Sequence, residues 1–345
     1  MLAVKRFTEK GNTMKNAKRI LALVLTLVLS ASVFLIPASA ASWNYNSAYK
    51  QYKGKTYTVF GDSISTGYDP HLTPKLYGMG DGVNPKAFPE LVASVTGTRI
   101  ARYSYDGCRT KDVYSLLGGS VPKDGYYTEF LEKGIFVAMN RPLAKPAAIK
   151  KSLKKSSLVT MNIGNNDIFT GPLVMAALDI AQLSEVSSKA AELVEQAVKR
   201  GILTKDFQSM FNTLNTLGLT VVFLEAMFAE MGKAMTEMAT YLPLVVSTIK
   251  ANTNGELAII GMYNPFRSVD TEIAGLKLSE AGDLTVKAIN AFLKENAKVL
   301  GYTYVNVFGT ECYYDTGEFQ DTHPTDKGYA TMAKKILKTI PHREA

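Results

Sequence analysis

Histidine, tryptophan and cysteine are all scarce in this chain, whose 345 residues include three, one and two of them respectively. Zinc sites draw many of their ligands from histidine and cysteine, and a two-metal phosphoesterase needs several histidines together with carboxylates. The three histidines, His71, His323 and His342, are too few for such a centre. We therefore expect no metal and no other cofactor.

A strong excess of charge of one sign is also missing once the first forty residues are set aside. The chain has 39 Lys and Arg and 31 Asp and Glu, of which six basic residues and one acidic residue, Glu9, lie within 1–40. The remainder has 33 basic and 30 acidic residues, a net charge of only +3. No basic run is interleaved with aromatic residues, so nothing predicts a nucleic-acid partner.

An apolar run near the start, Ile20–Ile36, does not belong to a folded domain. Basic residues precede it at positions 15, 18 and 19, and Ala38-Ser39-Ala40 supplies the small residues that signal peptidase reads. This pattern predicts a secretory signal over 1–40, cleaved after Ala40, and hence a secreted, extracellular protein without a permanent membrane span. A retained anchor is the alternative, but the run is shorter than a comfortable span. Both Met1 and Met14 are candidate starts.

After a linker-like segment at 41–55, short β-rich runs alternate with helical patterns, which predicts one α/β domain over 56–341. Strands that alternate with helices favour a parallel sheet covered on both faces. The expected strands are Thr56–Phe60, Arg99–Tyr103, Leu158–Ile163, Leu257–Met262 and Tyr302–Phe308, and the expected helices include Pro89–Val95, Ala147–Leu153, Ala281–Leu300 and Lys327–Ile340.

The interval 172–250 is much longer than an ordinary crossover and has helical periodicity throughout. We expect one helix to end near Lys199-Arg200-Gly201, a second at Gly218, and Pro243 to break or kink a third. The third helix carries a stripe of Leu224, Met227, Phe228, Met231, Met235 and Met238. Such a stripe is most often core packing, whereas the sharper hypothesis is a lid whose flexible apolar face lines an acyl-chain site.

Four polar motifs follow four of the predicted strands. They are "GDS" at 61–63, "DG" at 106–107, "GNND" at 164–167 and "DTHP" at 321–324. In a parallel sheet the carboxyl ends of the strands meet at one edge, where chemistry is usually placed. We therefore expect these motifs to converge on one site.

The residue types in these motifs fit nucleophilic catalysis. A serine such as Ser63 attacks only when a base removes its proton, and histidine is the natural base near neutral pH. His323 is the candidate, with His71 as a rival in a loop-like segment and His342 in the terminal tail. The amide of Asn166 and the backbone N–H groups of Ser63 and Gly107 suit an oxyanion hole, while Asp167 fits a loop-holding role. Each motif alone could also be an ordinary turn.

The ordered set of motifs resembles the SGNH, or GDSL, hydrolases over about Thr56–Ile340. The resemblance implies Ser63 as nucleophile and His323 as general base. It also implies an oxyanion hole formed by the Ser63 and Gly107 N–H groups with the Asn166 side chain. The implied fold is a flavodoxin-like, three-layer α/β/α sandwich with a five-stranded parallel sheet, here with a helical insertion at 172–250.

One position departs from the family pattern. The family carries an aspartate three residues before the histidine, where this chain has Gln320, and Asp321 stands two residues before His323. Either Asp321 reaches the imidazole through a different loop geometry, or a backbone carbonyl such as that of Gln320 orients the ring. We favour Asp321 slightly.

The two cysteines, Cys108 and Cys312, would sit in an oxidising compartment. They could form a disulfide, or they could be free buried thiols, and the sequence does not separate the two.

The sequence thus predicts a carboxylic ester hydrolase, a GDSL-type esterase or lipase that works through an acyl-enzyme. The helical insertion favours lipid or other acyl esters, and deacetylation of a polysaccharide is the close alternative. A metal-dependent phosphoesterase and a non-catalytic surface protein are remote alternatives. The sequence does not predict an oligomeric state.

Overall fold

The computed structural model describes residues 43–72, 84–126, 143–184, 186–204, 206–269, 272–273, 276–318 and 321–342. The predicted signal at 1–40 and the carbonyl of Gln320 lie outside the described residues, so both stay predictions.

A five-stranded, all-parallel sheet forms the centre of the fold, with strand order β2-β1-β3-β4-β7. The order reverses at β1, which pairs with β2 on one side and with β3 on the other, for example Phe60 with Tyr103 and with Met161. Such a switch point leaves a crevice at the carboxyl ends of the strands. The five strands overlap the five predicted runs and are β1 (Thr56–Gly61), β2 (Arg99–Ser104), β3 (Ser156–Asn162), β4 (Glu256–Ile260) and β7 (Thr303–Val305).

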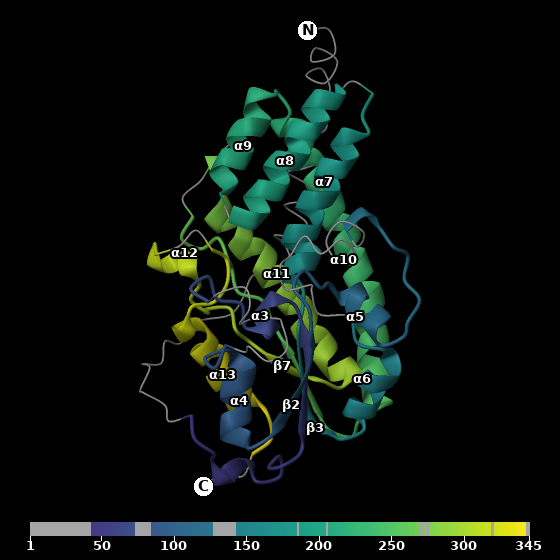
Figure 1. Cartoon of the computed structure of the whole chain (residues 1–345), viewed down its shortest axis with the longest axis vertical. Coiled ribbons are helices and arrows are strands. Elements are labelled where there is room, and N and C mark those ends of the chain that lie inside the picture. Colours follow the sequence, from purple (N-terminus) through teal and green to yellow (C-terminus); the bar gives the residue numbers. More distant parts are fainter. Residues whose placement is uncertain are drawn as a thin grey trace.

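Two hydrophobic cores lie on opposite faces of this sheet, because successive residues of a strand point to opposite sides. Val59 packs into one core and Phe60 into the other. Helices cover both faces, as Figure 1 shows, so the predicted three-layer α/β/α sandwich is confirmed. The helices on the Phe60 face are α5 (Thr110–Leu116), α6 (Pro146–Leu153), α11 (Leu278–Leu300) and part of α10 (Thr220–Lys250), and those on the Val59 face are α4 (Phe88–Thr96) and α13 (Asp326–Thr339).

The segment before β1, expected as a linker, packs against the domain over its described residues 43–55. It contains a 3₁₀ turn, η1 (Ser47–Tyr49), and its Tyr49 and Tyr52 are buried. The Tyr49 hydroxyl donates to the carbonyl of Leu337 at 2.8 Å, and the Tyr52 hydroxyl donates to that of Pro341 at 2.9 Å. These hydrogen bonds therefore join the segment before β1 to the carboxyl-terminal end of α13.

Beyond the sheet edge, α7 (Gly171–Ala181), α8 (Ser188–Thr204), α9 (Phe207–Thr216) and the first part of α10 form a helical cluster with a core of its own. Figure 1 shows α7, α8 and α9 side by side at one end of the molecule. From Met238 onward, the buried side chains of α10 pack into the sheet core instead. The interval 172–250 thus consists of a helical cluster, for which we keep the name helical insertion, followed by a helix that packs on the sheet.

Three expectations for this interval need correction or comment. Pro243 lies inside α10, which continues to Lys250, so it does not end the helix. The helix expected to end near Gly201 continues to Thr204, whereas the expected stop at Gly218 is confirmed by a left-handed φ of 69° there. Met238 is fully buried and Met231 and Met235 pack against the sheet core, which agrees with the core reading of the stripe. No described helix is long and apolar enough to cross a membrane.

The disulfide that the cysteines could have formed is absent, since Cys108 and Cys312 are both free and buried. Cys108 belongs to the core on the Phe60 face and Cys312 to the core on the Val59 face. The sheet therefore separates the two thiols, which is the physical reason why they do not pair.

Candidate active site

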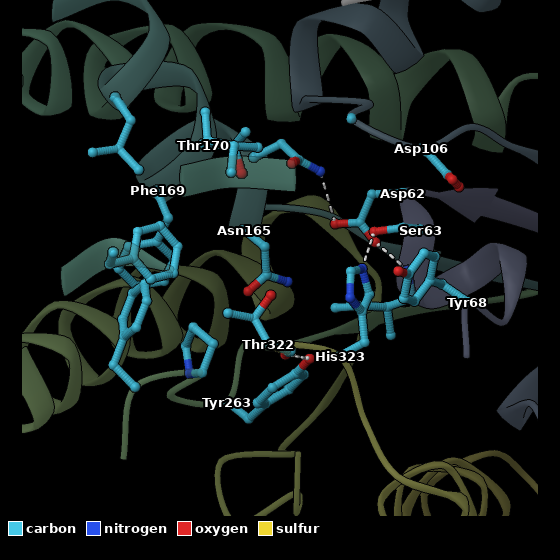
Figure 2. A pocket seen from close by; sticks show the side chains of 18 residues that line it. Asp62, Ser63, Tyr68, Asp106, Asn165, Phe169, Thr170, Tyr263, Thr322 and His323 are labelled. Atoms are coloured by element: carbon cyan, nitrogen blue, oxygen red, sulfur yellow. Dashed lines mark hydrogen bonds between the residues drawn. The ribbon is translucent and has the colours of Figure 1, made fainter. Parts of the chain in front are cut away.

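The four polar motifs converge at the carboxyl edge of the sheet, as the strand pattern predicts. They line one cavity of about 200 Å³, together with apolar residues from the insertion and from the segment after β4. Figure 2 shows Ser63, Tyr68 and His323 at one end of this cavity and Phe169 at the other, with Asn165 and Thr322 between them. The lining residues are Asp62, Ser63, Ile64, Tyr68, Asp106, Gly107, Asn165, Asn166, Phe169, Thr170, Leu173, Ile202, Phe207, Tyr263, Pro265, Phe266, Thr322 and His323.

Ser63 is placed at the end of β1 by a tight turn into the short helix α3 (Ser63–Thr66). Gly61 has a φ of 139°, and a Cβ there would lie 2.4 Å from the carbonyl oxygen of Asn162, so no side chain fits. The Asp62 carboxylate caps α3 by accepting the N–H of Ile64 at 3.0 Å. Ser63 thus becomes the first helical residue directly after a buried strand.

Ser63, His323 and Asp321 form a continuous hydrogen-bonded line. The Ser63 Oγ lies 2.8 Å from His323 Nε2, and His323 Nδ1 lies 2.6 Å from Asp321 Oδ1. The same Asp321 oxygen accepts the backbone N–H of His323 at 2.8 Å. This turn, in which an aspartate caps the N–H two residues ahead, explains how a carboxylate only two positions away reaches the imidazole.

The loop that carries the histidine is held by backbone bonds. The N–H groups of Tyr313 and Tyr314 donate to the carbonyls of His323 and Asp321 at 3.1 and 3.0 Å. The hydroxyl of Tyr263 donates to the carbonyl of Thr322 at 2.7 Å. Both ends of the loop are therefore fixed relative to β4 and to α12 (Tyr313–Thr316).

Tyr68, which the sequence motifs did not single out, stacks on the imidazole. Its ring centroid lies 4.1 Å from that of His323, with 29° between the ring planes. The Tyr329 hydroxyl of α13 donates to the Tyr68 carbonyl at 2.7 Å and holds this part of the loop after α3. The histidine is thus positioned on one face by an aromatic ring and on one edge by a carboxylate.

The residues expected to bind an oxyanion also meet here. Gly107 lies in the left-handed region with a φ of 78°, and Asn166 begins a π-helical turn, η4 (Asn166–Thr170). Asn166 Nδ2 lies 3.3 Å from Asp62 Oδ2 and 3.3 Å from the Cys108 carbonyl, both at the long end of hydrogen-bond distances. Its amide is therefore directed at the loops that carry Ser63 and Gly107.

Two buried carboxylates beneath these loops have raised pKa values. Burial, with a smaller contribution from the nearby Asp106 and Asp167, raises the pKa of Asp62 to about 7. Burial also raises the pKa of Asp167 to about 6, although this carboxylate accepts the N–H of Thr110 with both oxygens, at 3.0 and 3.1 Å. Asp167 thus links the loop after β3 to the loop after β2, which agrees with the loop-holding role expected for it.

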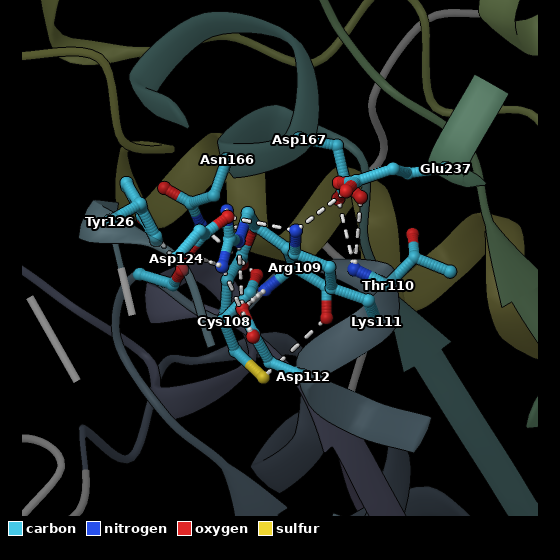
Figure 3. A network of polar contacts seen from close by, with 12 residues as sticks. Cys108, Arg109, Thr110, Lys111, Asp112, Asp124, Tyr126, Asn166, Asp167 and Glu237 are labelled. Carbon is cyan, nitrogen blue, oxygen red and sulfur yellow. Dashed lines mark hydrogen bonds and ion pairs between the residues drawn. The ribbon is translucent and has the colours of Figure 1, made fainter. Parts of the chain in front are cut away.

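A buried ionic network next to Gly107 was not expected from the sequence. Arg109 pairs with Asp112 at 3.0 Å and with Asp124 at 2.8 Å, and the buried Lys111 pairs with Asp124 and with Glu237 of α10, each at 2.8 Å (Figure 3). The only sequence signal was a cluster of charges directly after the "DG" motif. Because Glu237 lies on α10, the network ties that helix to the loop after β2.

Tyr126 connects the same region to the insertion. Its hydroxyl donates to the Gly107 carbonyl at 2.7 Å, its ring lies 4.2 Å from the Arg109 guanidinium carbon, and its side chain belongs to the core of the helical cluster. Nothing in the sequence marked this tyrosine, because its partners come from segments distant along the chain.

The other two histidines lie elsewhere. His71 Nε2 is 3.1 Å from Glu318 at a half-exposed position, and His342 Nδ1 is 2.9 Å from the carbonyl of Ile340. Neither lines the cavity. Among the described residues, no group of three or more His, Cys, Asp and Glu side chains is arranged to hold a metal ion.

Comparison with known proteins found one family model that matches most of the chain. A family model described as GDSL-like lipase/acylhydrolase matches residues 57–336. A search of curated proteins found no match.

Several solved structures are weakly similar to the chain. An extracellular lipase from Streptomyces rimosus is 18% identical, with 83% of this chain and 100% of that chain covered and a TM-score of 0.42. A phospholipase A1 from Streptomyces albidoflavus is 17% identical, with the same coverage and TM-score. A variant of an acetyl-xylooligosaccharide esterase from Geobacillus stearmophilus is 13% identical, with 84% and 95% covered and a TM-score of 0.38. At these TM-scores the similarity adds nothing to the family match.

Proposed function

The chain belongs to the GDSL-like lipase/acylhydrolase family, and on that premise we propose that it is a secreted serine esterase that hydrolyses carboxylic esters through an acyl-enzyme. The observation that carries the proposal is the line from Ser63 Oγ through the His323 ring to Asp321, with distances of 2.8 and 2.6 Å. The motif order alone does not require these three side chains to be hydrogen-bonded.

In the proposed mechanism, Ser63 Oγ attacks the ester carbonyl carbon while His323 Nε2 takes the hydroxyl proton. Asp321 accepts a hydrogen bond from the Nδ1–H group, which fixes the tautomer and stabilises the imidazolium. His323 then gives its proton to the leaving alcohol, and the acyl group stays on Ser63. Water attacks this acyl-enzyme with His323 again as base, which releases the acid and restores the serine.

The negative charge on the carbonyl oxygen requires nearby donors in each tetrahedral intermediate. We assign this role to the N–H groups of Ser63 and Gly107 and to Asn166 Nδ2. The two long bonds of Asn166, both 3.3 Å, support the assignment, because a weak bond is readily exchanged for a stronger one to an oxyanion.

The cavity favours an ester with a longer acyl chain over an acetyl ester as the substrate. Apolar side chains line the cavity beyond the catalytic residues, and an acetyl group would leave most of that surface without contacts. The alternative is O-deacetylation of a carbohydrate by the same residues. In that reaction the sugar is the alcohol part of the ester, and the wall beyond Asn165, which is mostly apolar, would offer it few hydrogen bonds.

The proposal is tested by the hydrolysis of p-nitrophenyl butyrate by the secreted chain, with Ser63→Ala as the matched control. We expect measurable turnover in the parent chain and a loss of about thousandfold or more in the variant, with unchanged thermal unfolding. Turnover that vanishes in excess chelator, or that survives in the variant, would contradict a serine mechanism. Recovery of a chain beginning at residue 41 from the medium tests secretion and cleavage.

A further inference from the structure

We propose that the helical insertion sets the length of the acyl chain that this enzyme accepts, with Ile202 of α8 and Phe207 of α9 closing the far end of the cavity. The favoured substrates are then esters of short to medium acyl chains, of roughly four to eight carbons by the volume argument below. This inference rests on the proposed function, which it makes specific.

The two ends of the cavity differ in chemistry. The end at Ser63 and His323 is polar, with Asp62, Asp106 and Asn166 in its wall. Buried carboxylates and amides make this end unfavourable for a hydrocarbon chain, because their hydrogen bonds would have to be given up. An acyl chain attached to Ser63 therefore has one favourable direction, away from the oxyanion donors and toward Phe169, which lies at the opposite end of the cavity in Figure 2.

The opposite end is a packed apolar wall. Phe169 meets Phe266 edge to face with ring centroids 5.2 Å apart, and Phe266 meets Phe207 in the same way at 5.4 Å. Leu173 of α7 and Ile202 of α8 complete the wall. Phe169 and Phe266 come from the loops after β3 and β4, whereas the other three residues come from the insertion, so the insertion determines where the cavity ends.

The cavity volume limits the chain length. An apolar cavity of about 150 Å³ holds benzene, which corresponds to roughly 25 Å³ for each carbon. The present cavity of about 200 Å³ also includes the space beside Ser63 that the ester carbonyl occupies. On this scale the whole cavity holds roughly eight carbons, the carbonyl carbon included, and a fatty acyl chain of twice that length would have to extend out through the open mouth of the cavity.

Four of the five side chains of the end wall are buried, and Phe169 is partly buried. Ile202, Phe207, Leu173 and Phe266 each have at most 8% of their surface exposed, and all four belong to the core of the helical cluster. Because well-packed cores yield little to a misfitting group, the wall acts as a steric limit.

The experiment measures kcat/KM for p-nitrophenyl acetate, butyrate, hexanoate, octanoate, dodecanoate and hexadecanoate. For the parent chain we expect a maximum between butyrate and octanoate, with a rise of about fourfold for each methylene added before the maximum. A maximum at acetate, or a value that still rises at hexadecanoate, would overturn the proposal.

Two substitutions should move the maximum in opposite directions. Phe207→Ala removes part of the end wall, so the ratio of dodecanoate to butyrate hydrolysis should rise by about tenfold, with room for two or more extra methylenes. Ile202→Phe fills the same end, so the maximum should move toward acetate or butyrate. Phe207→Leu is a milder opening that guards against a failure of Phe207→Ala to fold.

Leu214→Ala is the matched control, because Leu214 of α9 is fully buried in the same cluster but does not line the cavity. It should lower the thermal midpoint without changing the chain-length profile. An equal shift of the profile in Leu214→Ala and Phe207→Ala would mean that general loosening sets the preference, which overturns the inference. If the parent chain hydrolyses none of the esters, the proposed function fails; if it hydrolyses all six with a flat profile, only this inference fails.

Discussion

The catalytic edge of the sheet and the helical insertion are built in different ways. At the edge, nearly every functional group is fixed by a hydrogen bond, either within its own loop, as with Asp321 on His323, or to a neighbouring loop, as with Asp167 on the N–H of Thr110. In the insertion, helices are joined by apolar contacts around a separate core. The two regions meet at the cavity, where one supplies the reacting groups and the other supplies much of the apolar wall.

On the proposed function, this difference predicts that reactivity and substrate selection are separable. Hydrogen bonds hold the proposed reacting atoms, so we expect changes there to alter the rate for every ester. An apolar wall discriminates only by volume, so changes there alter the preference among esters. The predictions below test this division.

The largest effect is expected for the general base. His323→Ala should lower kcat by about thousandfold or more for every ester, because Ser63 then has no group to take its proton. We expect the same loss of kcat for butyrate and for octanoate, and steady-state kinetics with both esters measures the two values. A loss restricted to one ester would show that reactivity and substrate selection are not separable.

Asp321→Asn tests the open question about the group that orients the histidine. The amide oxygen can still accept the N–H of His323, so the turn should persist, but the negative charge beside the ring is lost. We expect kcat to fall by about a hundredfold or more with little change in KM. Activity within a factor of about two of the parent would show that another acceptor, such as the carbonyl of Gln320, orients the ring.

Asp62→Asn tests the buried charge beneath the nucleophile. With a pKa of about 7, Asp62 keeps a proton in the folded chain between about pH 4 and pH 7, where the unfolded chain has released it. The free energy that protonated Asp62 contributes to folding is therefore fully present below the pKa of the unfolded chain, about 4, and is lost as the pH rises through the folded pKa of about 7. Asparagine also caps helices but does not titrate. The variant should gain stability relative to the parent by roughly 4 kcal/mol between about pH 4 and pH 8, since folding raises the pKa by about three units.

Urea unfolding of both chains at several pH values measures this difference. A constant difference across the range would contradict a raised pKa for Asp62.

Tyr126→Phe tests the contact between the two regions. It removes the hydroxyl that donates to the Gly107 carbonyl at 2.7 Å and leaves the ring in the insertion core. We expect a loss of about 1 to 2 kcal/mol in unfolding free energy and a fall in kcat of severalfold, with KM unchanged. A shift in chain-length preference without a change in kcat would mean that Tyr126 serves the insertion and not the catalytic edge.

Glu237→Gln should have the smallest effect. The side chain of Glu237 is 44% exposed, and its partner Lys111 keeps Asp124 at 2.8 Å. We expect less than about 1 kcal/mol of lost stability and no change in kcat. A fall in kcat of tenfold or more would show that α10 controls the oxyanion donors through the buried network.

The strands, and the meeting of the four polar motifs at the carboxyl edge of the sheet, could be predicted from the sequence because both depend on local signals. Buried parallel strands are short apolar runs, and the polar residues that follow them, such as Ser63 and Asn166, must meet once the sheet forms. The insertion was recognised from its helical period. The helix ends predicted within it were less accurate. Helix α8 continues beyond Gly201 and α10 continues beyond Pro243, because tertiary packing can outweigh these local stop signals.

The parts that could not be predicted depend on contacts between distant segments. Tyr68 stacks on a histidine about 250 positions away, and the aromatic contacts of Phe169, Phe266 and Phe207 join three separate loops and helices. The reach of Asp321 to His323 depends on a turn geometry that the spacing alone did not specify. Side-chain partners of this kind have no periodicity to reveal them.

Mass spectrometry of the folded chain after treatment with a fluorophosphonate tests whether Ser63 is the nucleophile. We expect one adduct, located on Ser63, that is absent from Ser63→Ala and forms far more slowly in His323→Ala. An unlabelled parent chain, or an adduct that persists in Ser63→Ala, would contradict that assignment.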